Sequence, residues 1–322
     1  RETERDMRQQ RLELADFRKS VVAVPPVAWT ESLELNPAAN AALVRHIEAG
    51  GISILLYGGN ANLYHIDLGR FRALLDLLRE TAGPSTAVIP SIGPDFGKML
   101  DQAPIVRDKG FSDVMVLPTA FPARAAGIER GVGLVAEALG FGVILYIKQN
   151  NYIEPDQLER MVKAGSVRFV KYAVERANPE GDTYLSDIVA AIGAERVASG
   201  MGERPIHSHL MTYGLATYTS GAVCIAPAAA LATLHAYRAG DLETAERLRA
   251  PFLEFERQRA EIDGFGVMHD AVTLSGIADM GPILPLLANI AKDKHETVAK
   301  CVKDLLDLEQ ACRAEGGQNS KV

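Results

Sequence analysis

Short runs of apolar residues recur along the chain, and each is followed by a stretch with the 3.6-residue periodicity of an amphipathic helix. The runs are apolar throughout, which is typical of strands buried on both faces in a parallel sheet. Eight strands are predicted, at residues 21–27, 52–57, 87–92, 113–117, 141–146, 167–174, 196–201 and 221–226. This rhythm predicts an α/β fold, a closed (β/α)8 TIM barrel over residues 21–240. An open doubly wound sheet is the alternative, but residues 58–60 do not complete the glycine-rich dinucleotide fingerprint.

Two segments lie outside this rhythm. Residues 1–20 are densely charged and predict a partly helical N-terminal arm lying on the surface, where no chemistry is expected. After Pro227 the pattern is helical without further strands, so residues 241–322 predict a C-terminal helical extension packed beside the barrel. One large domain with two appended segments is compatible with 322 residues, because α/β barrels commonly exceed about 250 residues.

Composition excludes several classes of partner. With 48% apolar and 23% charged residues, the chain has the composition of an ordinary globular protein. A formal net charge of −7 argues against nucleic acid, because a phosphate backbone is bound by a basic surface. No stretch approaches the ~20 uninterrupted apolar residues of a membrane span. Cys224, Cys301 and Cys312 lack metal-ligand spacing and are interpreted as reduced thiols of a cytoplasmic protein.

Lys171 is the exception to the apolar pattern, since it lies within the strand predicted at residues 167–174. Burial penalises the ammonium form, which lowers the pKa of a lysine and leaves more of the neutral amine. The neutral amine can attack a ketone to form a Schiff base, an electron sink that makes neighbouring bonds labile. Lys171 is therefore the candidate catalytic residue. The alternative is a strand-end lysine that reaches solvent or pairs with Glu175.

Tyr146 ends the fifth predicted strand, and Lys148 follows it two residues later. In a parallel barrel the active site lies at the carboxyl ends of the strands, so the Tyr146 phenol is a candidate proton relay, with simple packing as the alternative. Lys148 should share the side of Tyr146, because residues two apart in a strand face the same way. It is predicted to bind a distal substrate carboxylate or to lower the pKa of Lys171 as a second cation. A salt bridge to a loop acid is the alternative.

The chain resembles the dihydrodipicolinate synthase/N-acetylneuraminate lyase superfamily, class I Schiff-base lyases built on this barrel. The resemblance covers roughly residues 21–290 and is carried by Val143-Ile144-Leu145-Tyr146, Phe169-Val170-Lys171, Ala198-Ser199-Gly200-Met201-Gly202 and residues 218–227 followed by 238–241. Residues 218–227 are most similar to the branch that dehydrates keto-deoxy sugar acids. The resemblance implies that Lys171 binds the ketone of a 2-oxo acid and that Tyr146 moves the proton. It also implies that Met201 and Gly202 contact the substrate.

The loop after the second strand departs from this family. Where the family has Gly-Thr-Thr-Gly-Glu, the chain has Gly58-Gly59-Asn60-Ala61-Asn62, so both hydroxyls that hold the substrate carboxylate and extend the tyrosine relay are absent. We expect the Gly58–Asn60 loop to bind the carboxylate through the backbone N–H groups of Gly59 and Asn60 and through the Asn60 amide. A relay through Asn60 is not expected, since an amide does not pass protons as a hydroxyl does. A tight turn without a binding role is the alternative.

Other departures concern dihydrodipicolinate synthase itself. The arginine that those enzymes place after the strand-five tyrosine is missing from residues 146–152, and their strand-four tyrosine is replaced within residues 118–121. Both losses argue against lysine biosynthesis as the activity. Arg124, after the fourth strand, is predicted either to bind a substrate carboxylate or to form a surface salt bridge.

His207 and His209 follow the seventh predicted strand, with Glu203 nearby. A His-x-His pair can place two imidazoles on one side, but no third ligand follows at a recognisable spacing, so no metal site is predicted. His207 is instead predicted to contact substrate hydroxyls, with a loop position at a helix start as the alternative.

The sequence thus predicts a Schiff-base-forming lyase acting on a 2-oxo acid, either a pyruvate-type aldolase or a keto-deoxy sugar-acid dehydratase. The alternatives are dihydrodipicolinate synthase (4-hydroxy-tetrahydrodipicolinate synthase) and a catalytically impaired barrel that binds carboxylates. No dissociable cofactor is required, because Lys171 holds the substrate covalently. The resemblance implies a homo-oligomer, a dimer or tetramer, whose other partner is a small-molecule 2-oxo acid; neither nucleic acid nor membrane is an expected partner.

Overall fold

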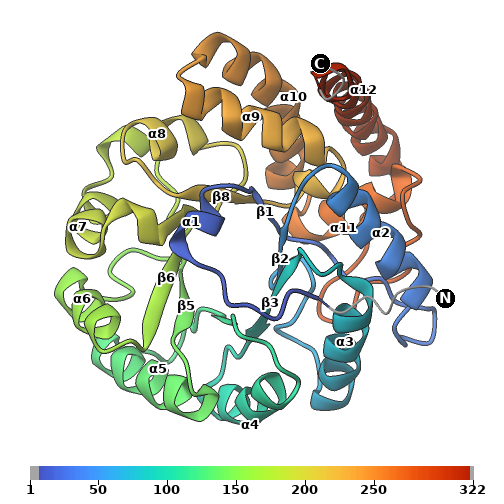
Figure 1. Cartoon of the computed structure of the whole chain (residues 1–322). Helices are drawn as coiled ribbons and strands as arrows, with labels where there is room; N and C mark the ends of the chain where they lie inside the picture. Colours follow the sequence, from blue (N-terminus) through green and yellow to red (C-terminus); the bar gives the residue numbers. More distant parts are fainter. Residues whose placement is uncertain (1–6, 320–322) are drawn as a thin grey trace.

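The computed structural model describes residues 7–319, with side chains through Glu315. Parallel strands close into a barrel in sequence order, with β8 paired to β1, as predicted (Figure 1). The strands are β1 (Val22–Ala23), β2 (Ile54–Tyr57), β3 (Ala87–Ile92), β4 (Met115–Val116), β5 (Val143–Ile147), β6 (Val167–Tyr172), β7 (Val197–Ser199) and β8 (Thr217–Ser220).

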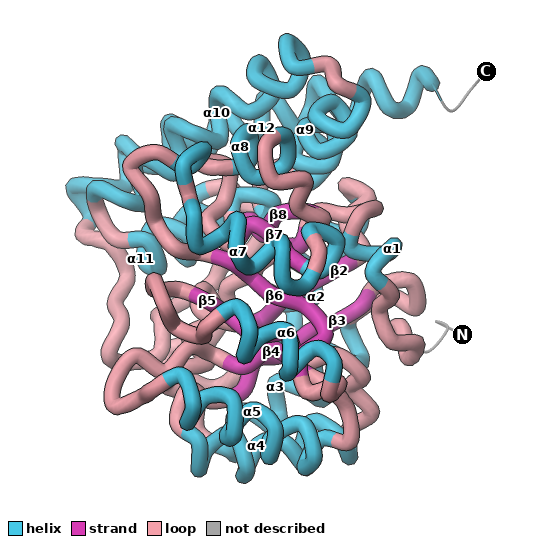
Figure 2. Tube along the Cα trace, turned by 90° about the vertical axis from the view of Figure 1, so that its left-hand side faces the viewer, coloured by secondary structure: helices cyan, strands magenta, loops and turns pink. Residues whose placement is uncertain are grey.

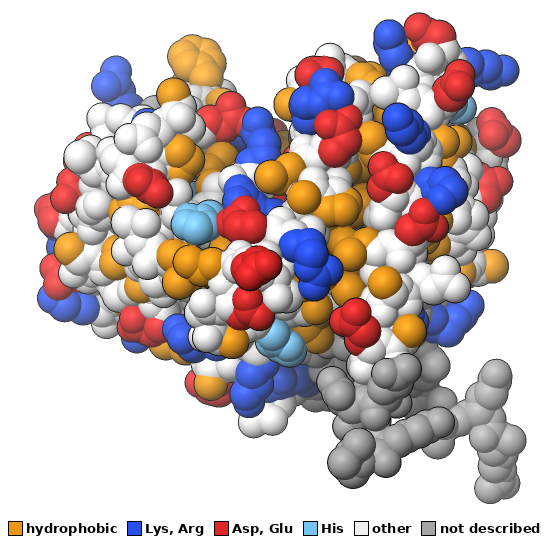
Figure 3. All heavy atoms as spheres, turned by 90° about the horizontal axis from the view of Figure 1, so that it is seen from above, with side chains coloured by type: hydrophobic (Ala, Val, Ile, Leu, Met, Phe, Trp, Pro, Cys, Tyr) orange, Lys and Arg blue, Asp and Glu red, His pale blue; other side chains and the backbone are white. Residues whose placement is uncertain are grey.

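Helices surround this barrel and continue beyond it (Figures 1 and 2). They are α1 (Leu14–Phe17), α2 (Pro37–Ala49), α3 (Leu68–Thr81), α4 (Phe96–Asp108), α5 (Ala125–Leu139), α6 (Pro155–Lys163), α7 (Thr183–Ile192), α8 (Ile206–Met211), α9 (Pro227–Ala239), α10 (Leu242–Glu261), α11 (Gly264–Leu274) and α12 (His295–Asn319). Helices α10, α11 and α12 pack against one another, and α10 and α12 also pack against α9. None of the helices within the described residues has the length and apolarity to cross a bilayer. On the face seen in Figure 3, acidic and basic side chains are interspersed.

The eighth strand lies earlier than the apolar pattern predicts. Residues 222–224, inside the predicted strand, form the 3-10 helix η3 (Ala222–Cys224) instead. The true strand β8 is rich in hydroxyls, yet Thr217 is fully buried, and its hydroxyl donates a hydrogen bond to the Ser20 carbonyl at 2.7 Å. A satisfied hydroxyl costs little to bury, so a strand of this kind escapes a search for apolar runs. Strand β7 likewise ends at Ser199, before the predicted end.

The described residues 7–20 of the N-terminal arm are partly helical, as predicted, but part of the arm is buried rather than lying on the surface. Leu12 and Phe17 are buried, and α1 lies across one end of the barrel (Figure 1). The Phe17 ring stacks on Phe169 with ring centroids 3.8 Å apart. This segment approaches the amino end of the barrel, because Phe169 lies near the start of β6. Residues 1–6 of the predicted arm lie outside the described residues.

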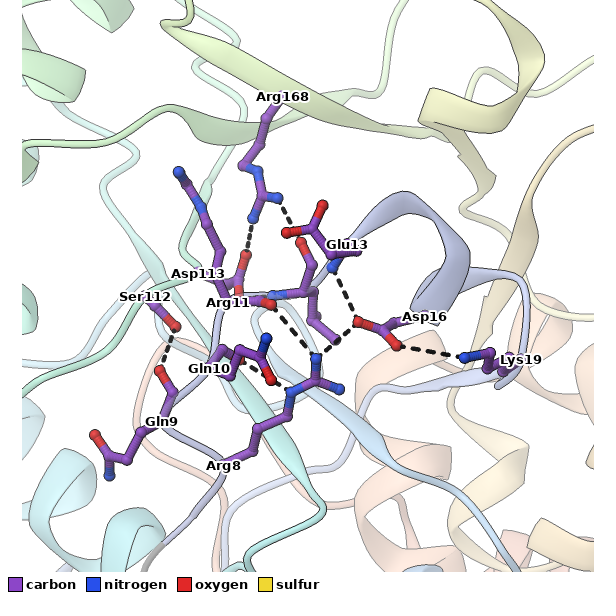
Figure 4. A network of polar contacts seen from close by, with 11 residues as sticks. Arg8, Gln9, Gln10, Arg11, Glu13, Asp16, Lys19, Ser112, Asp113 and Arg168 are labelled. Carbon is purple, nitrogen blue, oxygen red and sulfur yellow. Dashed lines mark hydrogen bonds and ion pairs between the residues drawn. The ribbon is translucent and has the colours of Figure 1, made fainter.

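A polar network fixes the same segment (Figure 4). The Leu12 backbone N–H donates to the Asp113 carboxylate at 3.0 Å, and Arg168 bridges Asp113 and the Leu12 carbonyl. Burial raises the pKa of Asp113, while the positive charge of Arg168 opposes that effect. Backbone groups of the arm are therefore joined to charged side chains from distant parts of the chain, a contact that the charge pattern of residues 7–20 does not reveal.

Candidate active site

Lys171 lies on β6 beside Tyr146 of β5, because the register of the two strands pairs these residues. Its side chain is almost fully buried, and Nζ lies over the Tyr146 ring, 4.1 Å from the centroid. Burial, followed by the positive charges of Lys148 and Arg259, lowers the pKa of Lys171 to about 7. A substantial share of this side chain is therefore the neutral, nucleophilic amine at neutral pH.

Tyr146 supplies a neutral phenol at the same place. Burial raises its pKa above the ordinary value, as does Tyr64, whereas Arg259 acts in the opposite direction. The amine of Lys171 meets the face of the ring. A proton that passes between the two groups must therefore travel through the substrate or through water.

A cavity of about 710 Å³ opens at these two residues. Its wall includes most of the residues that the sequence predicts for the site, namely Gly59, Asn60, Tyr146, Lys148, Lys171, Met201 and Gly202. Lys148 shares the cavity with Tyr146, as the strand alternation predicts. The ion pairs of the described residues include none for Lys148, so the alternative salt bridge to a loop acid is not seen.

Glu175 does not neutralise Lys171. Its carboxylate pairs with Arg204 at 3.0 Å, and both residues line the cavity. The alternative Lys171–Glu175 pair is therefore replaced by an ion pair that leaves the amine without a carboxylate partner among the described residues.

The Asn60 side chain of the Gly58–Asn60 loop makes two contacts within the protein. The Asn60 amide donates to the Val24 carbonyl at 2.8 Å and accepts from Arg259 at 3.2 Å, so both of its polar atoms already have protein partners. One N–H of the Asn60 amide remains without a partner among the described residues, so carboxylate binding by this amide and by the backbone N–H groups of Gly59 and Asn60 stays a prediction. Gly58 is not among the lining residues; a Cβ at that position would lie 3.0 Å from the Ser91 hydroxyl, so its small size serves packing.

His207 is not among the residues that line the cavity with Lys171 and Tyr146. Its Nδ1 lies 2.6 Å from a Glu246 carboxylate oxygen, and its ring meets Tyr237 edge-on. The short helix α8 turns His207 toward α9 and α10, away from the cavity wall. His209 instead places Nδ1 2.7 Å from the Ser199 hydroxyl, so the two histidines do not converge. Arg124 is exposed at the N-cap of α5 and does not line the cavity.

Three ionisable residues in or beside the site are not among the predicted site residues: Glu203, Glu256 and Arg259. Glu256 and Arg259 come from α10, form an ion pair of 2.9 Å and line the cavity. Glu203 is fully buried, and neither of its carboxylate oxygens has a hydrogen-bond partner among the described residues. Burial, with the neighbouring Glu256 charge, raises the pKa of Glu203 to about 8, so this side chain carries a proton at neutral pH.

Gly202 allows this cluster to pack against the cavity. Its φ of +63° lies in the left-handed region, and a Cβ there would lie 2.9 Å from the Glu256 carboxyl carbon. A larger residue would strain the backbone and displace the carboxylate that holds Arg259.

The fold and this site define a TIM-barrel enzyme with a buried lysine of depressed pKa at the carboxyl end of its sixth strand. Residues 17–305 match the sequence model of the dihydrodipicolinate synthetase family. The chain belongs to that family, and it is an enzyme of the lyase class.

Curated relatives are similar over most of the chain. A probable 5-dehydro-4-deoxyglucarate dehydratase of Rhizobium meliloti (strain 1021) is 24% identical over 272 residues, 78% of this chain and 85% of the relative. A protein of the same name from Xanthobacter autotrophicus (strain ATCC BAA-1158 / Py2) is 26% identical over 252 residues, 74% of this chain and 81% of the relative.

Solved structures share the fold. The sialic acid aldolase of Ruminococcus gnavus superimposes with a TM-score of 0.80 at 14% identity, covering 91% of this chain and 99% of its own. The dihydrodipicolinate synthase of Oceanobacillus iheyensis gives a TM-score of 0.78 at 18% identity, with the same coverage of 91% and 99%.

Proposed function

We propose that the protein is a Schiff-base-forming lyase that dehydrates a keto-deoxy sugar acid, a 2-oxo acid with a hydroxyl two carbons from the ketone. The observation that carries this proposal is the Lys171 amine, buried against Tyr146 in the wall of a 710 Å³ cavity. The similarity to proteins named 5-dehydro-4-deoxyglucarate dehydratase supports dehydration over the aldol cleavage that the sequence leaves open.

The chemistry begins with attack of the Lys171 amine on the C2 ketone. Loss of water from the resulting carbinolamine gives an iminium, which withdraws electrons from C2 and acidifies the protons on C3. Removal of one C3 proton gives an enamine, and the enamine expels the C4 hydroxyl, which leaves as water once it has been protonated. We assign the transfer of a proton between these positions to Tyr146, because a neutral phenol both donates and accepts. Hydrolysis of the final iminium releases the product and restores the amine.

No dissociable cofactor enters this scheme, because the iminium is the electron sink. We further propose that the protein acts as a homo-oligomer in the cytoplasm. Membership of the dihydrodipicolinate synthetase family supports the oligomer, because members of that family are typically oligomeric.

A substrate screen tests the reaction. Keto-deoxy sugar acids of different chain length and stereochemistry are incubated with the protein, with Lys171→Ala and with Lys163→Ala, a surface control on α6. We expect turnover of at least one acid by the protein and by Lys163→Ala, and none by Lys171→Ala. Condensation of pyruvate with aspartate semialdehyde would favour dihydrodipicolinate synthase instead, and the missing arginine after Tyr146 predicts that it does not occur. Carboxylate binding without turnover of any acid would support the catalytically impaired barrel.

A further inference from the structure

Arg259 extends from α10 into the wall of the cavity, although α10 lies outside the strand–helix repeats of the barrel. Three contacts hold its guanidinium. Nε–H donates to the Gly264 carbonyl at 2.9 Å, Nη1 to the Glu256 carboxylate at 2.9 Å, and Nη2 to the Asn60 amide oxygen at 3.2 Å. The side chains of Arg259 and Glu256 are only 16% and 7% exposed. The guanidinium is therefore fixed before any ligand arrives.

A guanidinium carries five N–H donors, and the contacts within the described residues use three of them. One N–H on each terminal nitrogen is left. A planar carboxylate can accept from both nitrogens at once, which is the geometry in which arginine binds carboxylates most strongly. The position of this donor pair matters, because Arg259 contacts Asn60. Asn60 belongs to the loop in which this chain lacks the two carboxylate-binding hydroxyls that the family resemblance leads one to expect.

The charges around Arg259 are balanced so that a further anion can enter. Glu256 offsets the positive charge of the buried guanidinium, which lowers the cost of burying it. An ionised Glu203 would add a second negative charge beside Glu256 and repel an incoming carboxylate. Glu203 is fully buried and holds its proton at neutral pH, so the cluster has one carboxylate and one guanidinium.

We propose that Arg259 binds the C1 carboxylate of the 2-oxo acid whose ketone Lys171 attacks, in place of the missing hydroxyls. This assignment rests on the proposed Schiff-base function and adds to it a residue from the C-terminal helices. Glu256 is then a positioning residue, because it orients the guanidinium without touching the substrate. The site accepts ketones with a carboxylate directly attached in preference to neutral ketones.

Borohydride trapping with two ketones tests this assignment. The fraction of Lys171 modified is measured by mass spectrometry against the concentration of pyruvate or of acetone, which lacks the carboxylate. The variants are Arg259→Gln, Arg259→Lys and Arg257→Gln. Arg257 is the matched control, because it lies on the same helix and its ion pairs among the described residues are with Glu254 and Glu261.

We expect Arg259→Gln to raise the pyruvate concentration for half-maximal trapping about 10- to 100-fold, the loss expected for hydrogen bonds to a charged group. The acetone curve changes far less, so the preference for pyruvate over acetone falls. Arg259→Lys keeps the positive charge but loses the pair of N–H donors that binds a carboxylate, so its pyruvate concentration for half-maximal trapping lies between those of the unmodified protein and Arg259→Gln. Arg257→Gln behaves as the unmodified protein. Loss of the Arg259 charge also raises the pKa of Lys171. That effect is the same for both ketones, so it cancels in the ratio of the pyruvate and acetone values.

An unchanged preference in Arg259→Gln overturns the assignment, provided that the unmodified protein is trapped. Should the unmodified protein form no adduct with either ketone, the Schiff-base proposal itself fails. Calorimetric titration with pyruvate then decides the carboxylate site separately. Binding that is weakened in Arg259→Gln and kept in Arg257→Gln supports the site, whereas equal binding by all three proteins, or none, contradicts it. Arg259→Lys keeps the test valid if the glutamine variant does not fold.

Discussion

Replacing Lys148 by methionine should raise the pKa of Lys171, because it removes a positive charge that disfavours the ammonium form. The register pairs Tyr146 with Lys171, and Lys148 lies two residues after Tyr146, just beyond the end of β5. With strands about 4.8 Å apart and a rise of about 3.3 Å per residue, the two lysine Cα atoms are about 8 Å apart. If the two ammonium groups are separated by a similar distance of about 8 Å, they interact by about 0.5 to 2 kcal/mol for effective dielectric constants between about 80 and 20.

That energy corresponds to a rise of about 0.4 to 1.5 pKa units, from a starting pKa of about 7. The pKa should stay below the ordinary lysine value of 10.5, because burial is the larger cause of its depression. Since only the neutral amine attacks the ketone, the rise in trapping rate with pH should move to higher pH by the same amount.

The assay is the rate of borohydride-trapped adduct formation at saturating pyruvate, followed across the pH range for the protein, for Lys148→Met and for Lys163→Met. Lys163 lies at the end of α6 and pairs with Glu159, so its loss should not move the curve. An unchanged midpoint in Lys148→Met would refute the idea that Lys148 acts on the amine electrostatically. A midpoint at the ordinary lysine value would instead show that the charge of Lys148, and not burial, sets the pKa.

Three further changes test other parts of the structure. Tyr146→Phe should lower kcat for the sugar-acid substrate by about 100- to 10,000-fold, the usual effect of losing a general acid–base group, and a kcat close to that of the unmodified protein would remove Tyr146 from the mechanism. Phe17→Ala should lower the free energy of unfolding in urea by about 3 to 5 kcal/mol, because it deletes a buried stacked ring, whereas the exposed control Lys19→Ala should change it little. Glu203→Gln should flatten the pH dependence of stability. The folded-state pKa of Glu203 is raised from 4.5 to about 8, so the unfolded chain loses its proton first and stability falls with rising pH across that window. Parallel stability curves for the two proteins would contradict the buried, protonated state of Glu203.

The barrel follows from the sequence because most of its strands are continuous apolar runs separated by amphipathic helices. The exceptions have a physical cause. Strand β8 is buried although Thr217 and Ser220 are polar, since hydrogen bonds satisfy their hydroxyls, and the more apolar residues 221–226 beside it are not a strand. The charged N-terminal segment packs at the barrel end because Arg168 and Asp113, far away in sequence, supply its partners.

Only part of the candidate site can be predicted from the sequence. Lys171 and Tyr146 are found because a strand that ends at the open side of a parallel barrel directs its last polar residues there. Arg259 and Glu256 give no such signal, since a Glu–Arg pair three residues apart is typical of a solvated helix face. Which face α10 turns toward the cavity depends on its packing against α9, α11 and α12. Glu203 looks like a loop acid until its burial is known.

Peptide mapping of the borohydride-reduced protein after incubation with pyruvate tests the account most directly. The account predicts one modified residue, Lys171, whose modification rises with pH in step with a pKa of about 7 and is absent in Lys171→Ala. Modification at Lys148 or at surface lysines instead, or no modification with any 2-oxo acid, would contradict the claim that the buried amine of β6 is the nucleophile.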